Sequence, residues 1–164
     1  MGVNKQTIEK FQVELSSKKP TPGGGVVAAL AASFSASLIE MVCNLTKSDS
    51  VLSISKRTRE IKKRLTTLAD ADVKAFDLVM KAYKLGKENP KRKGAIKKAL
   101  RYAIEVPMEV RKLAQELEKI GYRVSKIGNK NAISDAKTAI HLAHAASKSA
   151  LENVKINKEA LKKL

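Results

Sequence analysis

The chain has 164 residues, one cysteine, no tryptophan and a formal net charge of +17. A chain of this length suits one domain with a sizeable core, predicted here over residues 1–164. The lone Cys43 excludes an intrachain disulfide and a cysteine-based zinc site. Hydrophobic residues make up 43% of the chain but include only three Phe and three Tyr. The core must therefore consist mainly of Ala, Leu, Ile and Val, which favours closely packed helices.

The first half of the chain predicts three helices. Apolar residues at helical spacing mark the first over residues 5–16 and a long third over residues 51–85. The second, over residues 25–46, follows two prolines and the run Gly23, Gly24 and Gly25. No charge occurs from Thr21 to Ile39. A stretch of 19 residues approaches the length of a membrane span, but its serines and glycines predict a buried central helix and no membrane contact.

The second half predicts two more helices. Asn89 and Pro90 resemble a cap followed by the first helical position, so the fourth helix is expected over residues 90–126. Pro107 lies inside it and should kink it near residues 103–107. The fifth helix is expected from Ser134 to the C-terminus. The predicted fold is all-α, an antiparallel bundle of about five helices, two of them long.

Two of these helices carry faces of small residues. The alanines are Ala28, Ala29, Ala32 and Ala36 on the second helix, and Ala132, Ala136, Ala139, Ala143, Ala146 and Ala150 on the fifth. Small side chains allow close approach, so the two helices are predicted to pack together, within a subunit or across a dimer. A homodimer is favoured because so much of the second helix lacks polar residues for solvent.

The charge does not by itself indicate a partner. Of the 33 Lys and Arg, 26 are lysines spread along the chain, without a nucleic-acid-reading motif or interleaved aromatic residues. Nucleic acid is therefore not the expected partner, whereas lysine bias or a small polyanionic ligand accounts for the excess. The N-terminal residues show no apolar signal region, and a cytoplasmic location is expected.

A polar stripe runs along the second helix. Ser33, Ser37, Glu40 and Asn44 lie at i, i+4, i+7 and i+11 and share one side. A carboxylate on a neutral helix is costly to bury without partners, so the stripe is either a polar seam bonded to a neighbouring helix or the wall of a pocket. The glycine run adds free backbone N–H groups at the helix start, which suit an anion or a carbonyl group but also suit a plain turn.

Further polar groups cluster near the fifth helix. Ser134 is a good cap and Asp135 complements the helix dipole, but a capped helix start does not account for Asn129 and Asn131. Ser149, Asn153 and Asn157 form an i, i+4, i+8 row of neutral groups, suited to the edge of a heterocycle or to a helix interface. His141 and His144 lack a third ligand, so no metal is predicted.

Six segments, in this order, resemble the cyclodeaminase/cyclohydrolase family, which includes formiminotetrahydrofolate cyclodeaminases and methenyltetrahydrofolate cyclohydrolases. They are LSSKKPTPGGGVVAAL, EMVCNLT, DVKAFDLVMKAYKL, AIEVPMEV, GNKNAISDA and ALENVKIN. The resemblance covers about residues 15–157. It implies an all-helical homodimer with a folate site near the subunit interface, and no metal or redox cofactor beyond the folate substrate.

The resemblance also implies one of two reactions. Either 5-formiminotetrahydrofolate closes to 5,10-methenyltetrahydrofolate with loss of ammonia, or the methenyl bridge takes up water and opens to 10-formyltetrahydrofolate. Both need a group that accepts and donates a proton. Asp135, Glu40 and Asp72 lie at acidic positions of the matched segments, and Asp135 is the first expectation.

The substrate is then expected to be held by Gly23, Gly24, Gly25, Ser37, Asn44, Asn131, Ser134, Asn153 and Asn157. The lysines could attract a polyglutamate tail. The chain departs from the family at Val26, where serine is common, and at Lys137, where glycine is often found. The alternative function is a catalytically silent helical protein that binds folate or a polyanion.

Overall fold

The structure, a computed structural model, describes residues 2–164. It contains five α-helices: α1 (Ile8–Leu15), α2 (Gly24–Asn44), α3 (Leu52–Tyr83), α4 (Arg92–Ile127) and α5 (Ile133–Lys162). Three short 3-10 helices occupy Val3–Lys5, Asp49–Val51 and Lys130–Ala132, and no strand occurs within residues 2–164. The prediction of an all-α chain is confirmed.

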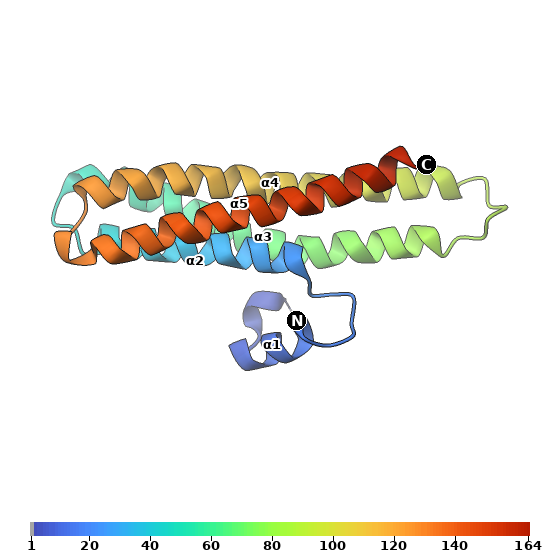
Figure 1. The fold of residues 1–164 in the computed structure, drawn as a ribbon, viewed down its shortest axis with the longest axis horizontal. Helices are drawn as coiled ribbons and strands as arrows, with labels where there is room; N and C mark the ends of the chain where they lie inside the picture. The colour runs from blue at the N-terminus through green and yellow to red at the C-terminus, as the bar shows by residue number, and fades with distance from the viewer. Residues whose placement is uncertain (1) are drawn as a thin grey trace.

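Helices α2 to α5 form the bundle, with successive helices running in opposite directions (Figure 1). Helices α2 and α4 each pack against both α3 and α5. The C-terminal end of α3 and the N-terminal end of α4 extend beyond the start of α2 (Figure 1). Pro107 lies inside α4, which is one helix from Arg92 to Ile127, and the kink expected there stays a prediction.

The alanine faces bring α2 and α5 together. Every alanine of the two predicted faces is buried, so the helices pack against each other within one chain. Ser35 of α2, which is fully buried, donates its hydroxyl to the carbonyl oxygen of Ala139 on α5 at 2.8 Å. Such a contact is possible because no large side chain separates the two backbones. The prediction is confirmed for packing within a subunit.

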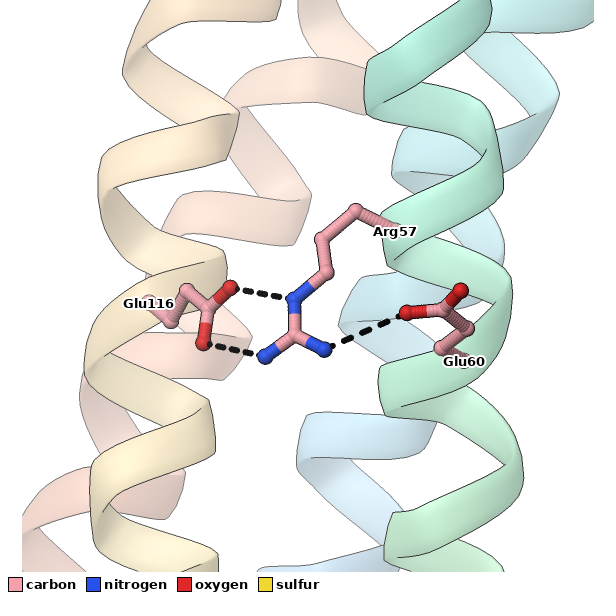
Figure 2. Close-up of polar contacts among 3 residues, drawn as sticks. All are labelled: Arg57, Glu60 and Glu116. Atoms are coloured by element: carbon pink, nitrogen blue, oxygen red, sulfur yellow. Dashed lines mark hydrogen bonds and ion pairs between the residues drawn. The ribbon is translucent and has the colours of Figure 1, made fainter.

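Helices α3 and α4 are joined by Leu and Ile contacts inside the bundle and by ion pairs outside it. Figure 2 shows Arg57 of α3 holding both carboxylate oxygens of Glu116 on α4, at 2.7 and 3.0 Å, and also Glu60 at 3.3 Å. These carboxylates raise the pKa of the Arg57 guanidinium. Since the pairs are exposed, they contribute little stability and mainly set the register of the two helices.

Helix α1 lies beside the bundle rather than in it (Figure 1). It contributes no buried residue, and Ile8 is 73% exposed. The N-terminal segment is held by the Val3 N–H, which donates to Asp70 at 2.6 Å, and by Phe11, which packs against the core. The helix expected over residues 5–16 therefore begins later, at Ile8, where Thr7 accepts a hydrogen bond from the Lys10 N–H.

Two expected helix caps are wrong. Helix α4 begins at Arg92 rather than Pro90, because Asn89 accepts from the Lys91 N–H and forms a turn ahead of the helix. Helix α5 begins at Ile133 without a side-chain cap from Ser134. Asn129 instead accepts from the Asn131 N–H and caps the short 3-10 helix that leads into α5.

Helix α2 is long and apolar enough to cross a membrane by length and mean hydropathy, and 56% of its apolar window is buried inside the structure. A core helix of a bundle passes the same test, and the burial against α3 and α5 favours that interpretation. The absence of membrane contact stays a prediction.

Candidate active site

The N-terminal end of α2 joins the glycine run to a carboxyl group from α3. Gly23 is the N-cap and supplies no side chain to bond the free N–H groups that follow. Asp72 supplies the acceptor instead, because the Val26 N–H donates to its carboxylate. A Cβ atom on Gly25 would lie only 2.6 Å from Asp72 Cγ. Glycine at position 25 therefore makes room for the carboxyl group.

Two opposing effects act on Asp72. Burial between α2 and α3 raises the pKa of its carboxyl group, and the hydrogen bond from the Val26 N–H partly offsets that rise. The net pKa is raised, so the group holds a proton more readily than an exposed aspartate. A carboxyl group of this kind can accept and return a proton near neutral pH more readily than an exposed one.

Asn153 of α5 lies on the other side of the glycine run. Its side-chain nitrogen is 3.9 Å from the position that a Cβ atom on Gly24 would occupy, and it donates to the Ser149 carbonyl at 3.0 Å. Asn157, one turn further along α5, donates its side-chain nitrogen to the Ala103 carbonyl of α4 at 2.8 Å. The structure thus gathers Gly23–Gly25, Asp72 and Asn153 at one place, with Asn157 nearby.

Glu40 occupies a different environment. Its carboxylate accepts from Arg59 at 2.9 Å and from Lys62, both on α3, and these bonds lower the pKa of the carboxyl group against the opposing effect of burial. Ser37 donates to the Ser33 carbonyl on its own helix at 3.1 Å. These contacts favour the polar-seam interpretation of the α2 stripe. A shallow basic groove of about 490 Å³ lies beside the seam and is lined by Ser33, Lys56, Arg59, Glu60, Lys62, Lys63 and Thr66.

Asp135 lies at the opposite end of α2 from the glycine run. Asn129, just ahead of α5, donates through its backbone N–H to the Thr46 hydroxyl at 2.9 Å and through its side chain to the Leu45 carbonyl at 2.8 Å. Asn44, Asn131, Ser134 and Asp135 therefore belong to the C-terminal end of α2. Because α2 has 21 residues, about 30 Å separates its two ends. Within one chain, Asp135 and the glycine run are not brought together.

Sequence reasoning ranked the acids in an order that the geometry does not favour. Asp135 was the first expectation, but among the three acids Asp72 is the one that lies against the glycine run. Only the family resemblance indicated Asp72, since the helical spacing of α3 carries no sign that Gly25 would meet it. Within residues 2–164 the structure shows no group of three or more His, Cys, Asp or Glu that could hold a metal.

Fold and site together make the chain an all-α bundle protein whose polar groups converge at one helix end, an arrangement suited to a small ligand. It belongs to the formiminotransferase-cyclodeaminase family, whose family model matches residues 7–163. The resemblance inferred from the six sequence segments is confirmed.

Two relatives and one solved structure are informative. The chain is similar to a methenyltetrahydrofolate cyclohydrolase of Methylorubrum extorquens, with 37% identity over 95% of this chain and 81% of the relative. It is 30% identical to the formimidoyltransferase-cyclodeaminase of Rattus norvegicus over 92% of this chain, but spans only 30% of that protein. A crystal structure of a formiminotetrahydrofolate cyclodeaminase from Thermotoga maritima matches with a TM-score of 0.88 and 32% identity, over 97% of this chain and 81% of that one.

Proposed function

We propose that the chain is an enzyme of folate one-carbon metabolism. It either converts 5-formiminotetrahydrofolate to 5,10-methenyltetrahydrofolate with loss of ammonia, or hydrolyses 5,10-methenyltetrahydrofolate to 10-formyltetrahydrofolate. The names of the relatives support both reactions, because one is a cyclohydrolase and the others are cyclodeaminases. Folate is then the substrate, and no further cofactor is proposed.

The observation that carries the proposal is the half-buried Asp72 carboxyl group at the glycine run. In ring closure, N10 of the folate attacks the formimino carbon, the N10 proton leaves, and the departing nitrogen takes up a proton as ammonia is lost. In hydrolysis, water adds to the bridging carbon and loses a proton, and the bond from that carbon to N5 breaks as N5 takes up a proton. Asp72 is proposed to accept and return the proton in either case.

The surrounding groups are proposed to hold the substrate. Backbone N–H groups at the start of α2 can donate to oxygen atoms of the folate, and the positive end of the helix favours negatively charged ones. Asn153 lies close enough to the glycine run to contact the same ligand. A polyglutamate tail is proposed to follow the lysine-rich surface.

A homodimer is part of the proposal. Outside the bundle, α2 exposes an apolar stripe in which Val27, Phe34 and Met41 are 38%, 55% and 37% exposed. A second copy is proposed to cover this stripe through a two-fold contact, in which the same surface meets itself. Phe34 is the midpoint of α2. An antiparallel pairing centred there would bring Asp135 of one subunit towards the glycine run of the other.

A cytoplasmic location is the last part of the proposal. A lone, buried Cys43 is compatible with a reducing compartment, and the cytoplasm is proposed.

A silent binding protein is the second candidate, and a separate groove favours it. Between the far ends of α3 and α4 lies an open groove of about 1160 Å³. Its lining includes Lys74, Lys81, Lys97, Lys98, Arg101 and the acid Glu105. Such a surface attracts a polyanion without needing catalysis.

The test uses both substrates. Purified protein is mixed with 5,10-methenyltetrahydrofolate while the near-ultraviolet absorbance of the methenyl group is followed, and then with the 5-formimino compound while the same absorbance is expected to rise. Asp72→Asn should slow the preferred reaction by about 10²–10⁴-fold. Asp77→Asn, an exposed acid on the same helix, is the matched control. Folate binding without turnover of either compound would leave the silent protein as the better account.

A further inference from the structure

Pro107 interrupts the hydrogen bonding of α4. A residue in the middle of an α-helix donates its N–H to the carbonyl four positions earlier, but proline has no N–H to donate. The carbonyl left without this partner is that of Ala103, a residue that is buried. A buried carbonyl without a partner is costly, so a replacement donor is expected.

Asn157 of α5 is that donor. Its side-chain nitrogen lies 2.8 Å from the Ala103 carbonyl oxygen, although the two residues are 54 positions apart. Pro107 thus leaves open a bond that would otherwise lie within α4, and the open position is filled from the neighbouring helix. We refer to these three residues, Pro107, Ala103 and Asn157, as the latch.

The latch determines which end of the Asn157 amide remains for a ligand. Because the nitrogen is bound to Ala103, the side-chain oxygen is left to accept a hydrogen bond. Asn157 lies one turn, about 6 Å, from Asn153 along α5, and the Asn153 side chain lies beside Gly24 of the glycine run. Its own side-chain nitrogen is also bound to a carbonyl, that of Ser149. Both amides therefore offer oxygen atoms to a ligand with N–H groups.

We propose that Pro107 is a positioning residue for the folate site, acting through Ala103 to fix Asn157 as a hydrogen-bond acceptor. This inference rests on the proposed function, because the matching donor is an N–H group of the pterin ring. It assigns a role to a proline that otherwise only weakens α4. It also predicts that restoring an N–H at position 107 will stabilise α4 and yet weaken binding of the substrate.

Pro107→Ala tests this prediction directly. The new N–H bonds Ala103 within α4, so the unfolding midpoint should rise, while Asn157 loses its fixed orientation. We expect KM for the folate substrate to rise at least fivefold, and by a larger factor than kcat falls. Gly94→Ala is the matched control, since it also strengthens α4 and its new Cβ meets nothing within 4 Å. It should raise the midpoint and leave KM unchanged. An unchanged KM in Pro107→Ala overturns the inference.

A second measurement keeps the latch separate from the proposed function. Asn157→Ala should lower the unfolding midpoint when Pro107 is present, because the Ala103 carbonyl then has no hydrogen-bond donor. In the Pro107→Ala background, Asn157→Ala should lower the unfolding midpoint by at most half as much. If Asn157→Ala lowers the unfolding midpoint equally in the two backgrounds, the latch is overturned, whatever the catalytic activity of the variants. If wild-type protein neither binds nor turns over a folate while the losses differ, the latch stands and the folate role of Asn157 falls with the proposed function.

Discussion

Gly25→Ala probes the contact between α2 and Asp72. The new Cβ atom would overlap the Asp72 carboxyl group, with Cγ only 2.6 Å away, so the carboxyl group must move and give up the Val26 N–H. Overpacking costs about 1–3 kcal/mol, and the loss of a hydrogen bond to a charged group about 1.5–3 kcal/mol. Alanine in place of a helical glycine stabilises the folded state by about 0.5–1 kcal/mol. The net loss is about 3 kcal/mol, or about 6–12 °C in Tm for a chain of this size.

Gly24→Ala is the matched control. Its Cβ would lie 3.9 Å from the Asn153 side-chain nitrogen, an ordinary contact, so stability should stay the same or rise slightly. Both variants are compared by thermal unfolding followed by circular dichroism and by turnover of the folate substrate. Asp72→Ala should remove most of the penalty of Gly25→Ala, because it deletes the overlapping atoms. If Gly25→Ala matches wild type in both Tm and turnover, Asp72 does not lie against the glycine run and the proposed site is wrong.

Three further predictions concern stability and assembly. Thr58 is fully buried and its hydroxyl has no hydrogen-bond partner, so Thr58→Val should raise the free energy of unfolding in urea by about 1 kcal/mol. A lower free energy of unfolding would instead mean that the hydroxyl forms a hydrogen bond. Because burial raises the pKa of Asp72, its contribution to stability is present below the unfolded pKa and is lost as pH rises through the folded pKa. Asp72→Asn should therefore be more stable than wild type at pH 7, with the difference disappearing below the ordinary pKa of 3.8; a difference independent of pH would contradict the raised pKa. Phe34→Glu should convert the proposed dimer to a monomer in sedimentation analysis, and a dimer that survives it is not built on the exposed face of α2.

The helices were predictable because their cause is local. Apolar spacing marked α1 and α3, turn and cap residues bounded α2, α4 and α5, and the alanine faces indicated that α2 and α5 would approach closely. The helix starts were less predictable, because several residues competed for each cap. Asn89 and Ser134 are both good caps by residue type, yet Asn89 forms a turn ahead of α4 and Asn129 caps the short helix ahead of α5. The N-terminal segment is held beside the bundle by a hydrogen bond from Val3 to Asp70, a contact that the spacing of residues 2–16 does not predict.

By itself, the sequence determined the helical class, the small-residue contact between α2 and α5, and the family. Only the tertiary structure decided which acid meets the glycine run. Gly25 and Asp72 are 47 positions apart, and helical periodicity relates residues only along one helix. The packing of α2 on α3 brought them together and left Glu40 paired with Arg59 and Lys62. The antiparallel packing of α5 on α2 placed Asp135 at the far end of α2, a position that no spacing rule along a single helix predicts.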